Sequence, residues 1–174
     1  MVKDILVIGT GISGLTFAIK VAEENPKLSL TLISKMDINE GNTKYAQGGI
    51  AVVRNLKKDS TEKHIQDTLN AGDGACDSEV VKFVVEEANE RLDELIEWGA
   101  AFDKKKEQFD LGIEGGHSEK RIVHYKDQTG KQIQEVLTAK VKSFSNVAIL
   151  ENHTLVDLIT DCLLYTSPSP RDAT

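Results

Sequence analysis

Three glycines, Gly9, Gly11 and Gly14, occur near the start of the chain with the spacing G-x-G-x-x-G. They follow the apolar run DILVI at residues 4–8 and open a segment of helical periodicity, a context that predicts a turn for a dinucleotide pyrophosphate. Gly9 allows a sharp turn, Gly11 leaves room for phosphates, and Gly14 lets the helix pack on the sheet. The amino end of the helix offers N–H groups and a partial positive charge. A tight glycine turn without a ligand is the alternative.

The end of the second predicted strand argues against a simple nicotinamide dehydrogenase. An acidic residue usually binds the ribose at this place, and here the chain has Ser34 and Lys35. Lys35 lies either near a phosphate or ring edge of the cofactor or in solvent. No Lys-Ser or Lys-Thr pair follows the glycine string, which excludes a nucleotide-triphosphate P-loop.

A second glycine-bearing stretch, NTKYAQGG, occupies residues 42–49 and runs into an apolar segment. It follows the second predicted strand, so we expect it at the same carboxyl edge of the sheet as the first loop. Gly48 and Gly49 let the backbone approach a flat ligand, while Asn42, Thr43 and Gln47 add hydrogen-bond donors and acceptors. The pattern suits a cofactor with a long polar edge, such as an isoalloxazine. An ordinary Gly-Gly loop is the alternative.

The third element is EGGHS at residues 114–118. Its glycines predict a loop that approaches a small ligand, and Glu114 supplies one carboxylate. At 4 Å this charge repels a dicarboxylate without an amine by about 1 to 4 kcal/mol, and it attracts an ammonium group. For Glu114 the alternative is a solvated loop residue. His117 either contacts substrate or flavin or is a structural histidine.

A β-α-β order positions these residues. Residues 4–8 predict a strand buried on both faces, apolar residues recur at helical spacing over 15–22, and residues 28–34 predict a second strand. Pro26 ends the helix. The unit predicts a crossover between parallel strands.

Further elements follow along the chain. A helix capped by Ser60 runs through about residue 70, and a helix at 78–98 ends at Gly99. Its apolar face carries Val81, Val84, Val85, Ala88, Leu92, Leu95 and Ile96. Another helix is expected at 131–144, strands at 49–53, 121–124, 147–151 and 155–160, and irregular structure at 35–49 and 103–121.

Composition limits the function classes. Of the 174 residues, 40% are hydrophobic and 28% charged, which is typical of a globular domain. The net charge of −7 argues against nucleic-acid binding. No apolar run approaches membrane-spanning length, so we expect no membrane span or signal peptide. Two cysteines predict no disulfide framework and a cytoplasmic location, and the four histidines lack metal-ligand spacing.

The segments DILVIGTGISGL, LISK, EGNTKYAQGGIA and IEGGHSEKRIVHYKDQTG resemble the L-aspartate oxidases, a family within the succinate dehydrogenase and fumarate reductase flavoproteins. The resemblance covers about residues 3–161. It implies an α/β, Rossmann-like FAD-binding domain with a parallel sheet. Residues 1–161 would be its N-terminal part, incomplete because the C-terminal half and the capping domain are missing. Residues 162–174, CLLYTSPSPRDAT, look like a translated sequencing adapter, with a native disordered tail as the alternative.

The resemblance also implies a non-covalent FAD site. The pyrophosphate would rest on residues 10–13, and residues 42–49 would line the flavin. The predicted cofactor-binding residues are Gly9, Thr10, Gly11, Ile12, Ser13, Gly14, Lys35, Asn42, Thr43, Lys44, Tyr45, Ala46, Gln47, Gly48 and Gly49. Membrane-bound relatives have at the Asn42 position a histidine that bonds covalently to flavin, and the Asn42 amide is not a nucleophile. The run His124, Asp127, Thr129 and Gly130 matches a family motif and predicts a helix start near the cofactor.

The implied reaction is oxidation of L-aspartate to iminosuccinate, with O2 or fumarate as acceptor. It is the first step of de novo NAD biosynthesis, and quinolinate synthase is the expected downstream enzyme. Glu114, which orients the substrate, and His117 are the predicted catalytic residues. Other family residues would lie beyond residue 161, so the fragment itself is expected to be inactive. A soluble fumarate reductase or succinate dehydrogenase flavoprotein and a non-catalytic dinucleotide-binding fragment are the alternatives.

Overall fold

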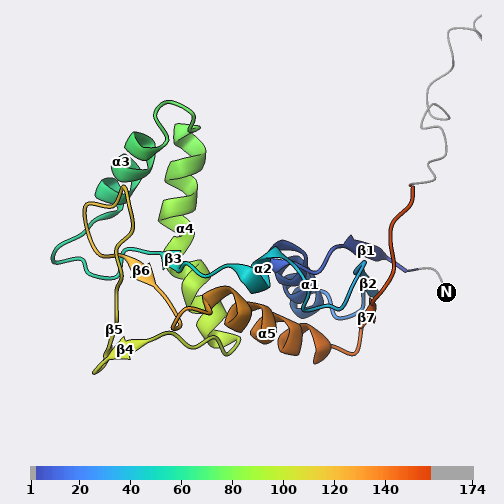
Figure 1. Ribbon diagram of the computed structural model, residues 1–174. Coiled ribbons are helices and arrows are strands. Elements are labelled where there is room, and N and C mark those ends of the chain that lie inside the picture. Colours follow the sequence, from blue (N-terminus) through green and yellow to red (C-terminus); the bar gives the residue numbers. More distant parts are fainter. Residues whose placement is uncertain (1–2, 158–174) are drawn as a thin grey trace, which may run out of the picture.

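The computed structural model describes residues 3–157 and contains a three-stranded parallel sheet (Figure 1). Its strands are β1 (Ile5–Ile8), β2 (Leu30–Ile33) and β7 (Val147–Leu150), in the order β1-β2-β7. Helix α1 (Ile12–Glu24) connects β1 to β2. The predicted βαβ unit is therefore confirmed, and the carboxyl ends of its strands share one edge of the sheet.

One face of this sheet forms the core. Helix α5 (Thr129–Lys142), which leads into β7, packs beside α1. Alternate strand residues point toward the two helices, as the two-residue period of a strand requires. The buried cluster includes Val7, Leu30 and Leu32 from the strands and Leu15, Ile19, Leu137 and Val141 from the helices.

The opposite face of the sheet is exposed and apolar on its two edge strands, whereas Thr31 of the central strand β2 is buried. Leu6 is 49% exposed and Ile8 is 52% exposed, and Leu150 is exposed as well. The prediction that residues 4–8 form a strand buried on both faces is therefore wrong. The reason is that β1 is an edge strand, and within residues 3–157 the helices α1 and α5 pack on the other face.

A second group of elements lies at the other end of the molecule (Figure 1). Strand β3 (Ile50–Ala51) pairs antiparallel with β6 (Ile122–Val123), and helices α3 (Thr61–Ala71) and α4 (Ser78–Glu97) pack on each other. The Ser60 hydroxyl accepts a hydrogen bond from the N–H of Lys63 at 3.2 Å, which confirms the predicted cap.

Short elements depart from the predictions. Residues 42–45, expected to be irregular, form the helical turn α2 (Asn42–Tyr45), and the expected loop at 103–121 contains a hairpin of β4 (Lys104–Lys105) and β5 (Gln108–Phe109). Residues 155–157 do not form the expected strand. The rest of that strand and the tail at 162–174 lie outside the described residues.

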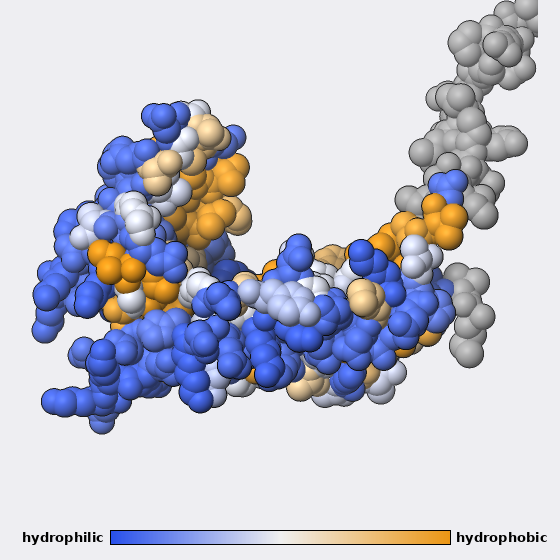
Figure 2. All heavy atoms as spheres, in the orientation of Figure 1, coloured by the Kyte–Doolittle hydropathy of each residue, from blue (hydrophilic) through white to orange (hydrophobic). Residues whose placement is uncertain are grey.

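The predicted apolar face of α4 is only partly buried. Val85, Leu92 and Leu95 belong to the core, whereas Val84 and Ile96 are exposed. Figure 2 shows hydrophobic side chains gathered along this helix. One stripe contacts the core, and the neighbouring apolar positions lie at the surface.

Candidate functional site

The two predicted glycine loops meet at the carboxyl edge of the sheet. The N–H of Ile12, at the amino end of α1, donates to the Thr43 hydroxyl at 3.1 Å, across 31 positions of sequence. Gly11 lies beside the same hydroxyl, because a Cβ added to Gly11 would be 3.6 Å from Thr43 Oγ1. The two loops therefore form one continuous surface.

Gly9 and Gly14 shape the first loop as the sequence predicts. Gly9 has a φ of +101°, a region that other residues rarely adopt. A Cβ on Gly14 would lie 2.1 Å from the Gly9 carbonyl oxygen, so only glycine lets the helix approach this closely. Gly11 and Ser13 are exposed, and the first turn of α1 contains no acidic residue. The positive end of the helix is thus available to an anion.

Two buried side chains support this loop from below. Gln134 of α5 donates from Nε2 to the Thr10 carbonyl at 3.0 Å and to the Ile38 carbonyl at 2.9 Å. The Thr10 hydroxyl is buried and donates to the Ser34 hydroxyl at 3.0 Å. The Thr10 side chain therefore faces the protein, and the Ile12 N–H is already paired with Thr43. Lys35, next to Ser34, is exposed.

The second loop presents an exposed polar edge. Its exposed residues are Asn42, Tyr45, Ala46, Gln47 and Gly48. The N–H of Gly130, at the start of α5, donates to the Ala46 carbonyl at 3.0 Å and fixes the loop on that helix. Helix α5 therefore begins beside the second loop, as the sequence predicts.

Glu40 orders two side chains of α2. Its carboxylate accepts from Lys44 Nζ at 2.9 Å and from the Tyr45 hydroxyl. Hydrogen bonding to Glu40 raises the pKa of Lys44 and of Tyr45 above their ordinary values. Lys44 therefore stays a cation near the polar edge.

The third loop, residues 114–118, places Glu114 next to Gly48 of the second loop. A Cβ added to Gly48 would lie 3.5 Å from Glu114 Oε1, and Glu114 is exposed. The His117 N–H donates to the Glu114 carbonyl at 3.2 Å, which closes a turn. Two predicted groups, the Gly-Gly segment and the carboxylate, are thus adjacent.

His117 points into a different environment. Its half-buried ring packs edge-on against buried His64 of α3, with ring centroids 5.9 Å apart. Burial, followed by the charge of Arg121, lowers the pKa of His64. His117 thus packs on α3 through its ring, and its predicted contact with substrate or flavin stays a prediction.

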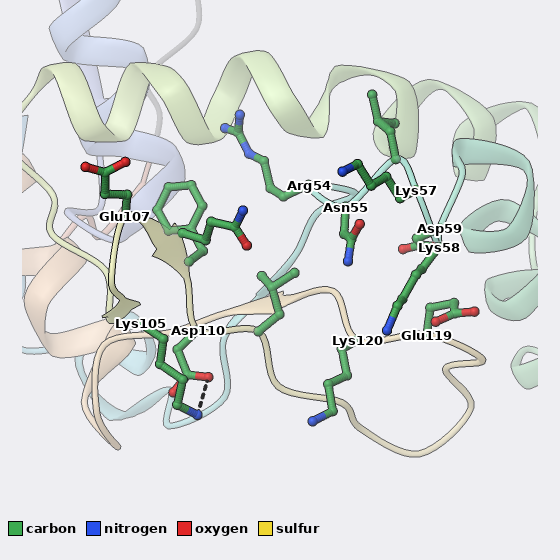
Figure 3. Close-up of a pocket in the computed structure, with 14 residues that line it drawn as sticks. Arg54, Asn55, Lys57, Lys58, Asp59, Lys105, Glu107, Asp110, Glu119 and Lys120 are labelled. Atoms are coloured by element: carbon green, nitrogen blue, oxygen red, sulfur yellow. Dashed lines mark hydrogen bonds and ion pairs between the residues drawn. The ribbon is translucent and has the colours of Figure 1, made fainter.

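A separate cavity of about 1030 Å³ lies beyond the end of the third loop (Figure 3). It is lined by residues 54–59 and 107–111 together with Lys105, Glu119 and Lys120. None of the predicted site residues contributes to this lining. Several of its charges are already paired, including Lys105 with Asp110 at 2.8 Å.

Sequence reasoning missed two side chains that hold the site. Gln134 supports the first loop, and Asp67 of α3 bonds the third loop through Ser118. The only signal for Gln134 was a polar residue on the buried face of a helix. The sequence around Asp67 contains no signal for its role, because its partner Ser118 lies 51 positions away.

Known proteins are similar to this chain over most of its length. A family described as FAD binding domain matches residues 4–164. An L-aspartate oxidase from Yersinia pestis is 42% identical over 164 residues, covering 91% of this chain and 30% of that protein. One from Vibrio cholerae is 43% identical with the same coverage. A chloroplastic L-aspartate oxidase from Oryza sativa is 42% identical, covering 90% and 24%. The chain thus spans less than a third of the length of these curated relatives.

Solved structures share the fold. E. coli quinol fumarate reductase superposes with a TM-score of 0.86 at 29% identity, covering 91% of this chain and 27% of that chain. A Mycobacterium smegmatis Sdh1 complex gives a TM-score of 0.78 at 29% identity, covering 86% and 27%. The predicted α/β FAD-binding fold is confirmed by these similarities.

Proposed function

Because this chain belongs to the FAD binding domain family, we propose that the complete protein oxidises L-aspartate to iminosuccinate. The relatives named L-aspartate oxidase support this reaction. The observation that carries the proposal is the Glu114 carboxylate beside Gly48. A negative charge next to the flavin-lining loop attracts the ammonium group of an amino acid.

The residues present fit FAD. The exposed backbone at Gly11 and Ser13 and the positive end of α1 suit a pyrophosphate, and the polar edge at residues 42–49 suits an isoalloxazine. FAD, when bound, supplies the two-electron oxidation. The protein's part is to bind and orient it, with Gln134 and Thr43 holding the loops in register. Asn42 lacks a nucleophilic ring, so the cofactor is held without a covalent bond.

Glu114 selects the substrate by charge. At 4 Å its carboxylate attracts an ammonium by about 1 kcal/mol in bulk water and about 4 kcal/mol near a protein surface. Succinate has two carboxylates and no amine, so the same charge repels it. L-aspartate carries both the carboxylates and the amine, and it is the dicarboxylate that this site accepts.

O2 or fumarate reoxidises the FAD, and quinolinate synthase consumes iminosuccinate on the route to NAD. Within residues 3–157 no helix has the length and apolar composition to cross a membrane. The low cysteine content favours the cytoplasm, although the Oryza sativa relative is named chloroplastic.

A fumarate reductase or succinate dehydrogenase flavoprotein is the second candidate. The likeness to E. coli quinol fumarate reductase favours it. Glu114 argues against it, because a carboxylate beside the flavin loop disfavours a substrate without an amine.

The test is a comparison of substrates with the complete FAD-loaded protein. We expect turnover of L-aspartate and little turnover of succinate. Glu114→Gln should lower kcat/KM for L-aspartate at least tenfold, which corresponds to about 1.4 kcal/mol, and should not lower that for succinate, which the carboxylate repels. Glu119→Gln, which removes a half-buried carboxylate that pairs with Lys63, is the matched control from the same loop. A preference for succinate in the unmodified protein would contradict the proposal.

A further inference from the structure

A fully buried arginine lies behind the Glu114 loop. Arg121 has no exposed surface, and its guanidinium donates to Asp59 from Nε at 2.9 Å and from Nη2 at 2.8 Å. Its Nη1 donates to Asp67 Oδ2 at 2.6 Å. One cation thus faces two carboxylates, from the segment before α3 and from α3 itself.

Asp67 has a second set of partners. The same Oδ2 accepts the Ser118 N–H at 2.8 Å and the Ser118 hydroxyl at 2.8 Å. These bonds from Ser118, with those from Arg121, lower the pKa of Asp67 to about 2. The carboxylate is therefore charged at neutral pH and joins α3 to the loop that carries Glu114.

The face of α3 toward this loop has helical spacing. His64 contacts His117, Asp67 contacts Ser118, and Ala71 lies 3.3 Å from the position of a Cβ on Gly116. Positions 64, 67 and 71 lie on one side of a helix. The loop thus rests along a stripe of α3, with Asp67 as its central polar contact.

The loop has few other fixed points. Its two ends meet where Gly112 and Ile122 pair, Glu119 forms an ion pair with half-exposed Lys63 at 3.3 Å, and Arg121 Nη2 donates to the Ser118 hydroxyl at 3.5 Å. Ion pairs that stay open to solvent contribute little to order. Within residues 113–119, the two hydrogen bonds from Ser118 to Asp67 have an acceptor that is both charged and largely buried.

We propose that Asp67 is a positioning residue that clamps the 113–119 loop onto α3 and thereby sets the Glu114 carboxylate beside Gly48. The catalytic consequence rests on the proposed function, in which Glu114 binds the substrate ammonium. Asp67 does not touch substrate or cofactor and acts through Ser118. Its loss removes the two hydrogen bonds that hold Ser118 on α3, which loosens the loop and shifts the carboxylate from its place beside Gly48.

The effect of Asp67 on the loop can be tested apart from its effect on fold stability, because Arg121 keeps a second carboxylate partner. Arg121 keeps its two-pronged pair with Asp59 when Asp67 is replaced, so one buried cation still faces one buried carboxylate. Asp67→Ala therefore removes the loop contact without leaving an unpaired buried charge. Asp67→Asn keeps an oxygen that accepts from Ser118 and should be milder.

The first readout is hydrogen–deuterium exchange in residues 113–119 of the complete FAD-loaded protein. Asp67→Ala should raise exchange in this segment at least tenfold while leaving α1 and α5 unchanged. Glu119→Gln, the matched control, should change it less than twofold. Unchanged exchange in Asp67→Ala would overturn the clamp, whether or not the protein oxidises L-aspartate.

The second readout is steady-state kinetics with L-aspartate. Asp67→Ala should raise KM at least tenfold and change kcat less than threefold, with the bound FAD content unaltered and Asp67→Asn in between. In a Glu114→Gln background the same replacement should raise KM less than twofold, because Asp67 acts through Glu114. Equal effects in both backgrounds, or loss of FAD, would overturn the positioning role. No L-aspartate turnover in the unmodified protein, together with raised exchange in Asp67→Ala, would contradict the proposed function and leave the clamp standing.

Discussion

Replacement of Arg121 by Met should strongly destabilise the protein. The methionine has a similar length and no charge, so it leaves the carboxylate of Asp59, which is almost fully buried, without its cation. Asp59 keeps the hydrogen bond from the Ser60 N–H at 2.9 Å and loses two from the guanidinium. Asp67 retains Ser118 and is less affected.

The magnitude follows from the buried charge. Removing one partner of a buried ion pair costs about 3 to 5 kcal/mol, because the other charge stays out of water. In a domain of about 150 to 250 residues such a loss lowers the melting temperature Tm by roughly 6 to 20 °C, and the fall is smaller in the complete protein, whose relatives are about three times longer than this chain.

The assay is thermal unfolding of the complete FAD-loaded protein, with two comparisons. Asp59→Asn in the Arg121→Met background removes the stranded charge and should recover a large part of the loss. Arg54→Met is the control, because the partner of Arg54, Asp93, is largely exposed and that pair contributes below about 1 kcal/mol. A fall in Tm for Arg121→Met no greater than for Arg54→Met would refute the reasoning.

Three further predictions concern the loops. The fold lowers the pKa of Asp67 to about 2, so the charged carboxylate stabilises the folded protein fully above about pH 4 and loses this effect as the pH falls toward 2. The difference in Tm between wild type and Asp67→Asn should therefore close over that pH range. Gly14→Ala places a Cβ 2.1 Å from the Gly9 oxygen, and the variant should purify with little FAD, measured by absorbance. Gln134→Leu leaves the Thr10 and Ile38 carbonyls without their donor, and the FAD Kd from fluorescence titration should rise about tenfold, or about 1.4 kcal/mol.

Local patterns predicted the elements whose signals lie within one segment. The unit β1-α1-β2 combines an apolar run, a glycine turn and helical spacing, and the Ser60 cap stands directly before its helix. Turn α2 was missed because four residues carry no periodicity, and the β4–β5 hairpin because its strands have two residues each. Burial of β1 was misjudged because exposure depends on its place at the sheet edge.

The same limit applies to the candidate site. The three loops were found because glycine, amide and carboxylate residues cluster within each of them. The contacts that hold the loops could not be predicted from the sequence, because the hydrogen bonds join distant positions of the chain, as in Ile12 with Thr43 and Arg121 with Asp59. The supporting residues Gln134 and Asp67 are therefore known only from the fold.

The most direct test of the account is the FAD content of the complete protein, measured by visible absorbance before and after acid precipitation. We predict about one FAD per chain, all of it released into the supernatant because Asn42 forms no covalent bond. A colourless protein that takes up no added FAD would contradict the claim that the two glycine loops, joined by the Ile12 to Thr43 hydrogen bond, form the cofactor site.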